Sequence, residues 1–425
     1  MPTDAGPRRH RPARILYVQP NSEVGGSDIA LLRAVEALDR DRHEAVVALP
    51  GEGPLAPMLR AAGARVRLVP MAQLRTLPSP AHQARYLARF APAVRALRRV
   101  AGEEGCALVH TNSLYCLYGG FAARAARLPH LWHVREIPPE VPLARPALGR
   151  LVLALSSRVV AMTQGCADAL LGPRLAAARA DRVRVLSEGL DLDATWSPTR
   201  VAAEGRDIRA ELGLDPGTPL VGFVARLDPW KGLDVFLDAA ARVRAGVPGA
   251  VFLVSGDAPA GFEAHRDAMV ARAAALGLGE SVRFLGWRYR LGDIPALMAA
   301  LDVFCHASVR PEPFGLVLIE AMAMRAAVVA ARAGGPAEIV EDGVSGLLAA
   351  PGDPDALAGA VLSLLSDADR RRRVAEAGRA RVEARYSRAA FAASLNALYD
   401  EALADAAPGH DAASRAAERG EALAA

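Results

Sequence analysis

Two cations follow a short apolar segment in the second half of the chain. The segment Leu220–Ala225 runs into Arg226, Lys231 and Gly232, where a helical pattern begins. Cations at the carboxyl end of a strand, beside a helix N-terminus, favour an anion, because the first amides of the helix point at the same place. Arginine can hold a phosphate through two hydrogen bonds, and lysine adds a point charge. The pattern predicts a phosphate site at the chain's single lysine; the alternative is a solvated loop with two incidental charges.

Two glutamates on a later segment supply hydrogen-bond acceptors. Glu312 lies in a proline-rich loop, Phe314 and Gly315 begin a predicted helix, and Glu320 falls inside that helix. The amides near Phe314, Gly315 and Leu316 would be unpaired donors of the helix start. A carboxylate at Glu320, among apolar neighbours, would need hydroxyl partners. Together these groups predict a site for a polyhydroxylated, negatively charged ligand; the alternative is a capping loop followed by an amphipathic helix.

Alternating strand and helix patterns must position these residues. Short apolar runs predict strands at Arg14–Gln19, His43–Leu49, Arg65–Pro70, Ala107–Thr111, His130–Arg135, Arg158–Met162 and Arg182–Leu186, then at Leu220–Ala225, Ala250–Ser255, Val282–Leu285, Val303–His306, Ala327–Ala331 and Gly346–Ala349. Helical periodicity between them, as at Ser27–Leu38 and Leu114–Arg127, indicates an α/β fold with parallel sheets buried on both faces.

A proline- and glycine-rich stretch divides the two series of strands. It predicts an N-terminal Rossmann-like domain over residues 1–192, a linker over 193–217 and a second such domain over 218–385. A helix over 386–405 would follow and could cross back to the first domain. A disordered tail over 406–425 would come last. Two such domains would bind their ligand in the cleft between them.

Several classes of protein are excluded or disfavoured by the composition. No run of about 18 apolar residues predicts a membrane span, and Met1–Pro12 has no apolar core of a secretory signal. The basic residues lack the interleaved aromatics and motifs of nucleic-acid binding. Gly51-Glu-Gly53 matches part of a dinucleotide fingerprint, but the next predicted strand ends without the acidic residue that would bind a ribose. No His/Cys cluster has metal-ligand spacing. Asp191-Leu-Asp193 resembles a D-x-D metal motif, but it lies at the boundary between the first domain and the linker rather than after a mid-domain strand.

The spacing of these motifs resembles a known family. Arg226 and Lys231, followed by Glu312 and Glu320, are similar to the retaining glycosyltransferases of the GT-B fold, family 4, over about residues 14–400. Further matching pieces are Gly25-Gly26, His133 in Trp-His-Val-Arg-Glu, Gly256-Asp257 and Gly334-Gly335-Pro336-Ala-Glu338. Two segments depart from the family pattern: Asn-Gly-Val-Asp reads Glu188-Gly189-Leu190-Asp191, and Gly-Gly-Ala-Glu reads Gly25-Gly26-Ser27-Asp28.

The resemblance implies a role for each matching residue of the second domain. Arg226 and Lys231 would hold the donor diphosphate and stabilise its departing charge. Glu312 would bind sugar hydroxyls with help from the amides of Phe314, Gly315 and Leu316, and Glu320 would bind the ribose. Gly286, Trp287 and Arg288 would contact the nucleotide base.

The resemblance also implies roles in the first domain. Gly25 and Gly26 would let the first loop approach the phosphates, since neither carries a Cβ. His133 would support the sugar near the reacting carbon. The alternative is that His133 is a histidine buried in its strand with no role toward a ligand. Because side chains neutralise the diphosphate, we expect no metal ion and no cofactor.

The resulting prediction is a retaining glycosyltransferase that uses a nucleotide-diphosphate sugar. Its acceptor would be a saccharide or a lipid-linked saccharide in polysaccharide or glycoconjugate synthesis, and retention is implied by the resemblance alone. The alternatives are a non-catalytic nucleotide-sugar-binding subunit of a polysaccharide assembly complex, and a phosphorylase or epimerase on the same fold.

A basic amphipathic stretch, Arg85–Ala101, bears on where the protein acts. Residues 51–100 hold nine arginines and one acid, Glu52. The stretch suits peripheral contact with an anionic membrane, so we expect a cytoplasmic protein at the inner membrane face. The alternative is a surface helix that packs its apolar stripe, Leu87, Phe90, Val94, Leu97 and Ala101, on the sheet.

Overall fold

The computed structural model describes residues 11–72, 79–287 and 293–406. The chain folds into two compact units: unit 1 comprises Met1–Ser187 and Phe391–Ala425, and unit 2 comprises Glu188–Ala390. The sequence placed this boundary at residue 192. Arg288 and the predicted tail from residue 407 lie outside the described residues. Over the three described ranges, no helix has both the length and the apolar character needed to cross a membrane.

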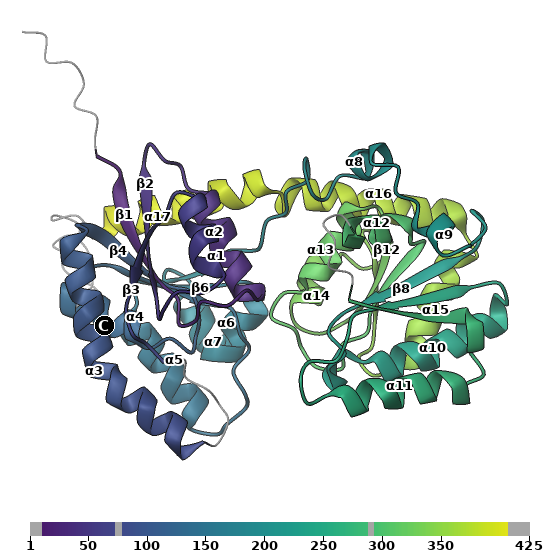
Figure 1. Ribbon diagram of the computed structural model, residues 1–425, viewed down its shortest axis with the longest axis horizontal. Helices are drawn as coiled ribbons and strands as arrows, with labels where there is room; N and C mark the ends of the chain where they lie inside the picture. Colours follow the sequence, from purple (N-terminus) through teal and green to yellow (C-terminus); the bar gives the residue numbers. More distant parts are fainter. Residues whose placement is uncertain (1–10, 73–78, 288–292, 407–425) are drawn as a thin grey trace, which may run out of the picture. The chain divides into compact units, whose positions relative to one another are not determined.

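Unit 1 is built on a seven-stranded parallel sheet of order β3-β2-β1-β4-β5-β6-β7 (Figure 1). Its strands are β1 (Ala13–Val18), β2 (His43–Leu49), β3 (Arg65–Leu68), β4 (Cys106–Thr111), β5 (His130–Val134), β6 (Arg158–Ala161) and β7 (Val183–Val185). Its helices are α1 (Gly26–Glu36), α2 (Leu55–Ala61), α3 (Pro80–Glu103), α4 (Tyr118–Ala126), α5 (Ala144–Leu155), α6 (Gln164–Leu171), α7 (Pro173–Ala178) and most of α17 (Arg388–Asp405).

Alternation along β1 explains why helices cover both faces of this sheet. Ile15 and Tyr17 pack in a core with α1, α2 and α17, whereas Leu16 and Val18 pack in a core with α3 and α4. Successive side chains of a strand point to opposite faces, so a strand buried on both faces must be apolar throughout. The central strands of unit 1 are largely apolar for this reason, whereas the edge strand β3 contains two arginines and is partly exposed.

Unit 2 repeats the plan with a six-stranded parallel sheet of order β10-β9-β8-β11-β12-β13. Its strands are β8 (Leu220–Val224), β9 (Val251–Ser255), β10 (Val282–Gly286), β11 (Val303–His306), β12 (Ala327–Ala331) and β13 (Leu347–Ala349). Its helices are α8 (Pro198–Ala203), α9 (Ile208–Glu211), α10 (Leu233–Gly246), α11 (Glu263–Ala275), α12 (Asp293–Ala300), α13 (Leu316–Ala323), α14 (Gly335–Ile339), α15 (Pro354–Leu365) and α16 (Ala368–Arg385). Helices lie on both faces of this sheet as well (Figure 1).

Each sheet has one point where the strand order reverses. In unit 1 this point lies between β1 and β4, and in unit 2 it lies between β8 and β11. Connections on the two sides of such a point run in opposite directions, so the loops that follow the two strands separate and leave room for a ligand. The residues after these strands are therefore the first candidates for a site in each unit.

Helix α17 completes the core of unit 1. Phe391, Leu395, Leu398 and Tyr399 are buried against residues of β1 and β2. The Tyr399 hydroxyl lies 2.7 Å from the hydroxyl of Tyr17 and 2.7 Å from Nδ1 of His110. The last helix is thus fixed to the centre of the unit 1 sheet by apolar contacts and by buried hydrogen bonds.

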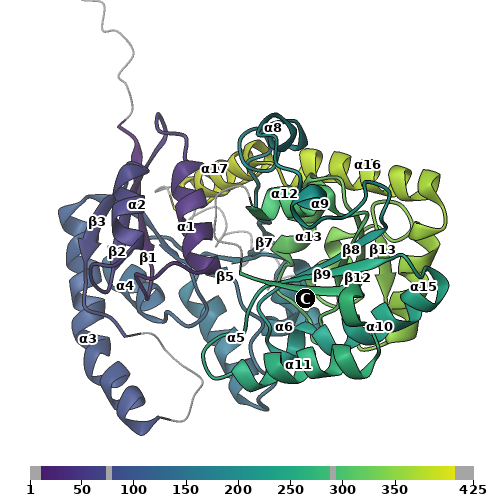
Figure 2. The same ribbon diagram turned by 45° about the vertical axis from the view of Figure 1, so that its right-hand side comes forward.

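Helix α3 contains the predicted basic stretch and packs beside α4 (Figures 1 and 2). Its apolar stripe mostly faces the protein, since Leu97 and Ala101 are buried and Phe90 and Val94 pack against the same core. Only Leu87 of the stripe is largely exposed, at 71%. The stripe is therefore used for packing on the sheet, as the simpler alternative predicted.

Candidate functional site

The loops after β8 and β11 meet at the switch point of unit 2. The amide of Val309 donates to the carbonyl of Trp230 over 2.9 Å, which joins the two loops. Gly232 has a φ of +74°, and a Cβ there would lie 2.0 Å from the carbonyl oxygen of Ala307. Only glycine fits such a position without moving the backbone. The sequence Lys231-Gly232 therefore lets the β8 loop lie directly against the β11 loop.

Lys231 and Glu312 form an ion pair in this place. The ammonium Nζ lies 2.5 Å from Oε1 of Glu312, and the two side chains are 17% and 7% exposed. Nζ also lies 4.2 Å from the centre of the Trp230 ring, within range of a cation–π contact. The structure thus brings together the predicted diphosphate cation and the predicted sugar-binding carboxylate.

Glu312 has two more donors on the same oxygen. The Ser308 hydroxyl donates to Oε1 over 2.5 Å, and Nε2 of His306 lies 2.9 Å from it. Burial alone would raise the pKa of Glu312, but His306 and Lys231 outweigh burial and hold that pKa well below its ordinary value. Glu312 is therefore a carboxylate at neutral pH, and its backbone is fixed by Gly335, whose amide donates to the Glu312 carbonyl over 2.8 Å.

Arg226 also has a carboxylate beside it. One of its terminal nitrogens lies 2.7 Å from Oδ2 of Asp228, and the side chains are 58% and 8% exposed. Arg226 thus reaches solvent while Asp228 stays buried. Each of the two predicted phosphate cations is paired with an acid of unit 2, so the charges of these two pairs balance.

The start of α13 offers free backbone donors. Gly315 precedes the helix with a φ of 104°. Among the residues that the structure describes, no hydrogen-bond acceptor is found for the amides of Phe314, Gly315 and Leu316. Glu320 lies in the second turn of the same helix and is half-buried, as its apolar neighbours predicted. These amides could hold phosphate or sugar oxygens, and Glu320 could accept from hydroxyls.

The residues predicted to contact the base lie after β10. The Gly286 carbonyl accepts from the Gly256 amide over 3.0 Å, so the ends of β10 and β9 are tied together. The Leu227 amide donates to the Asp257 carbonyl over 2.9 Å and ties in the β8 loop. Trp287 is half-buried. The role of these residues toward a base stays a prediction.

In unit 1, Gly25 begins α1 next to the first strand. The Gly25 amide donates to Oδ2 of Asp28 over 2.9 Å, and the other carboxylate oxygen of Asp28 accepts from Gln19. Asp28 replaces the glutamate of the family pattern, and here it still caps the helix. The backbone of Gly25 is extended, and a Cβ on Gly26 would meet no atom within 4 Å. The proposed approach of this loop to a phosphate therefore stays a prediction.

A chain of buried polar side chains joins this loop to His133. Asn112 donates to Oε1 of Gln19 over 2.9 Å, and Nε of Arg135 donates to Oδ1 of Asn112 over 2.8 Å. Arg135 lies 3.4 Å from Nδ1 of His133. His133 is 1% exposed, and burial, followed by Arg135 and His110, lowers its pKa well below the ordinary value. His133 is therefore neutral and buried within unit 1, and its contact with a sugar stays a prediction.

Sequence reasoning missed several members of these two clusters. They are Gln19, Asn112 and Arg135 in unit 1 and Asp228, His306 and Ser308 in unit 2. One signal could have found most of them, because each lies at or just after the end of a buried apolar strand. Polar residues at that position point toward the switch point of a doubly wound sheet.

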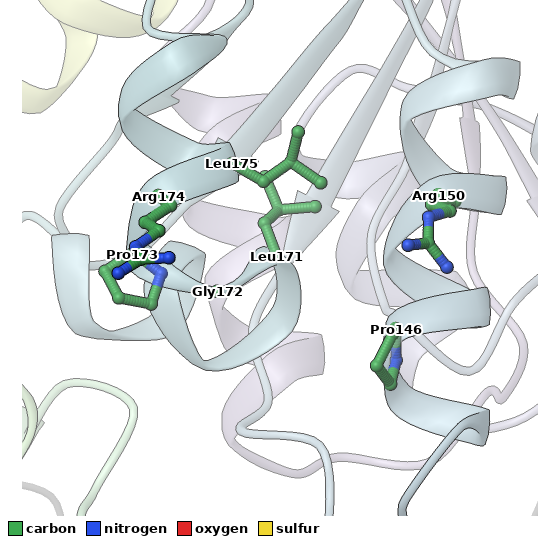
Figure 3. A pocket seen from close by; sticks show the side chains of 7 residues that line it. All are labelled: Pro146, Arg150, Leu171, Gly172, Pro173, Arg174 and Leu175. Carbon is green, nitrogen blue, oxygen red and sulfur yellow. The ribbon is translucent and has the colours of Figure 1, made fainter.

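Two negative observations limit the site. A pocket of about 440 Å³ in unit 1 is lined by Pro146 and Arg150 of α5 and by Leu171–Leu175 between α6 and α7 (Figure 3), and it contains none of the predicted site residues. Within the part of the chain that the structure describes, no group of three His, Cys, Asp or Glu side chains is placed to bind a metal ion. Each unit therefore has its own candidate cluster of side chains at its switch point.

The fold and the clusters define a pair of Rossmann-like units, with the Lys231–Glu312 cluster at the switch point of unit 2. A model of a glycosyl transferase 4-like domain matches residues 25–194, and a model of glycosyl transferases group 1 matches residues 205–381. The α-maltose-1-phosphate synthase of Mycobacterium tuberculosis is 30% identical over 316 residues, which cover 70% of this chain and 79% of that protein. The chain belongs to the group 1 glycosyltransferases.

Two further comparisons place the chain within that family. The D-inositol 3-phosphate glycosyltransferase of Nocardia farcinica is 36% identical over 244 residues, and this match spans only 50% of that protein's length. The crystal structure of Anabaena HepE in complex with UDP is 28% identical, with a TM-score of 0.74 over 92% of this chain and 100% of that one. HepE was also solved with UDP-glucose. These relatives share the GT-B fold.

Proposed function

We propose that the protein transfers a sugar from a nucleotide-diphosphate sugar to a saccharide or glycolipid acceptor, with retention at the anomeric carbon. The observation that carries this proposal is the Lys231–Glu312 pair at the switch point of unit 2, beside the free amides at the start of α13. A cation for the diphosphate, a carboxylate for the sugar hydroxyls and a second carboxylate, Glu320, for the ribose follow each other there. The similarity to HepE, which binds UDP and UDP-glucose, supports a donor of this class.

Charge balance explains how this site would favour bond cleavage. As the bond between the anomeric carbon and the diphosphate oxygen breaks, negative charge grows on the diphosphate. Cations held in place stabilise that charge without needing to reorganise. Arg226 and Lys231 each carry a carboxylate partner, so donor binding exchanges a carboxylate for a phosphate at each cation. Because the chain supplies both positive charges itself, the proposed mechanism uses no metal ion.

Retention follows if the acceptor attacks from the face that the diphosphate leaves. The acceptor oxygen forms its bond to the anomeric carbon as the bond to the diphosphate oxygen breaks. The acceptor proton passes to the departing diphosphate oxygen, so no protein nucleophile is consumed. In this proposal Glu312 holds the sugar and forms no covalent bond with it.

A ligand screen followed by an activity measurement tests the proposal. We expect UDP, GDP or ADP, and the matching nucleotide sugar, to raise the unfolding temperature, because a ligand that binds only the folded state stabilises it. Release of the nucleotide diphosphate should then increase on addition of an acceptor and persist in a chelator. Binding without release on any acceptor would instead favour a non-catalytic subunit. Strict dependence on added metal would contradict the proposed chemistry.

The outer face of α3 supports peripheral contact with an anionic membrane. Its exposed basic residues are Arg85, Arg89, Arg95, Arg98 and Arg99. None of them makes an ion pair with another described residue. Because the apolar stripe is packed on the sheet, this contact would be electrostatic rather than insertion of the helix. A lipid-linked acceptor would then be met at the surface on which the enzyme lies.

A further inference from the structure

Within the described residues, the polar contacts of the Glu312 carboxylate all fall on one oxygen. Nζ of Lys231, Oγ of Ser308 and Nε2 of His306 lie 2.5, 2.5 and 2.9 Å from Oε1. No hydrogen-bond partner of Oε2 is found among residues 11–72, 79–287 and 293–406. Three donors on one oxygen fix the plane of the carboxylate and leave the other oxygen available to a ligand hydroxyl.

His306 reaches the site through its contact with Glu312. It is the last residue of β11, it is 5% exposed, and its Nδ1 is buried with no hydrogen-bond partner among the described residues. Contact between Nε2 and a carboxylate oxygen is favourable only when Nε2 carries the proton. The charged and titratable groups around this contact are Glu312 and Lys231, while β12 places the apolar Ala330 beside His306. His306 therefore acts on the site through Glu312.

Glu312 needs a second fixed hydrogen-bond donor because the diphosphate would compete with it for Lys231. Lys231 is the predicted partner of the diphosphate, so donor binding draws its ammonium toward phosphate oxygens. Glu312 would then keep only Ser308 and His306. A serine hydroxyl rotates about its Cβ–Oγ bond, whereas the imidazole of a buried histidine at a strand end is held by its backbone and its packing.

We propose that His306 is a positioning residue, which holds Oε1 of Glu312 so that Oε2 faces the donor sugar while Lys231 binds the diphosphate. This inference rests on the proposed function, because it needs Glu312 to bind the sugar. It predicts a loss confined to the sugar part of the donor. A residue that merely stabilised unit 2 would weaken the binding of sugar and nucleotide together.

The test compares affinities for UDP-glucose and UDP in four variants. His306→Gln keeps an N–H donor near the position of Nε2, and His306→Asn is polar but one bond too short to reach Glu312. Glu312→Gln serves as the reference for loss of the carboxylate. His265→Gln changes a half-buried histidine of α11 and is the matched control.

We expect His306→Asn and Glu312→Gln to lower the preference for UDP-glucose over UDP by about tenfold, with UDP affinity within about threefold of the wild type. His306→Gln should recover most of the preference, and His265→Gln should not change it. Equal behaviour of the Asn and Gln variants, or an equal loss of UDP affinity, would overturn the positioning role. If UDP, GDP, ADP and the matching nucleotide sugars all fail to bind the wild type, the proposed donor site itself is wrong and the positioning role falls with it.

Discussion

Nζ of Lys231 lies 2.5 Å from Oε1 of Glu312, although 81 positions separate the two residues in the chain. The pair joins the loops that follow β8 and β11, the two strands at which the order of the unit 2 sheet reverses. Replacement of either residue therefore alters the charge at the point where doubly wound folds bind their ligands.

Replacement of Lys231 tests the importance of this pair for transfer. Lys231→Ala removes the cation that would meet the growing charge of the diphosphate and leaves Glu312 with two donors. We expect the transfer rate to fall by about 10²–10³-fold. Steady-state release of nucleotide diphosphate measures it. Arg242→Ala, which removes an exposed cation of α10, is the control and should keep full activity.

Glu312 should make the free energy of unfolding depend on pH. Its folded-state pKa is lowered, so its contribution to stability is present above its ordinary pKa of 4.5 and is lost as pH falls toward the folded-state pKa. We expect the stability difference between wild type and Glu312→Gln to be largest above about pH 5 and to shrink below about pH 4. Denaturant unfolding at several pH values measures it. A difference that does not change with pH would contradict the ionised pair.

Three buried histidines of unit 1 should make the free energy of unfolding depend on pH at milder acidity than Glu312 does. Burial lowers the pKa of His110 to about 3 and of His130 to about 4, and it also lowers the pKa of His133. The unfolded chain binds these protons first, so stability falls as pH drops below about 6.5, by about 1.4 kcal/mol per unit for each histidine. His43, a fourth buried histidine of unit 1, adds to the total slope because burial lowers its pKa as well. His130→Gln should therefore reduce the slope by the contribution of one histidine, about 1.4 kcal/mol per pH unit. An unchanged slope would show that His130 is not held neutral.

Tyr399 provides a test of the last helix. Tyr399→Phe keeps the ring but leaves Tyr17 and His110 without a shared hydroxyl. We expect a loss of about 1–3 kcal/mol in the free energy of unfolding, because buried polar groups lose their partner. Ala397→Ser, at an exposed position of α17, is the control. Equal stability of the Phe variant and wild type would mean that packing alone fixes the helix.

Vesicle binding tests whether the exposed arginines of α3 contact an anionic membrane. We expect the wild type to bind vesicles rich in phosphatidylglycerol at low salt and to be released at high salt, because surface charges are screened. Arg85→Glu, Arg89→Glu and Arg95→Glu together should abolish this binding. The same change at Arg242, Arg372 and Arg373, exposed residues of unit 2, should not. Binding that survives the triple change in α3 would show that another surface is responsible.

Much of the fold could be predicted because its strands are buried on both faces. The predicted bounds of His43–Leu49, Val303–His306 and Ala327–Ala331 match the structure, since apolar runs end where polar residues begin. The helix predicted from Leu114 begins only at Tyr118. Ser113 and Leu114 instead donate to the Glu136 carboxylate, a partner far along the chain that periodicity does not reveal.

Part of the candidate site could likewise be predicted from the sequence, and part could not. Arg226, Lys231, Glu312 and Glu320 could be picked out because their chemistry and spacing are local features. Asp228 as the partner of Arg226, and His306 as a donor to Glu312, depend on side-chain directions that spacing does not fix. The buried chain from Asp28 to His133 draws on the ends of three strands, and only the order of strands in the sheet brings those ends together.

The route of the chain sets the order in which the protein can mature on the ribosome. The two ends of unit 2 are tied to each other, since the Leu190 amide donates to the Tyr386 carbonyl over 2.8 Å and the Arg388 amide to the Leu190 carbonyl over 2.8 Å. Unit 2 can thus close on itself as soon as it is synthesised. Unit 1, although its first strand leaves the ribosome early, must wait for Phe391, Leu395 and Tyr399 before its interior is filled. A nascent chain stalled before residue 391 would hold a folded unit 2 and a unit 1 whose core lacks the side chains of α17. The apolar surface left uncovered there is where a chaperone would be needed.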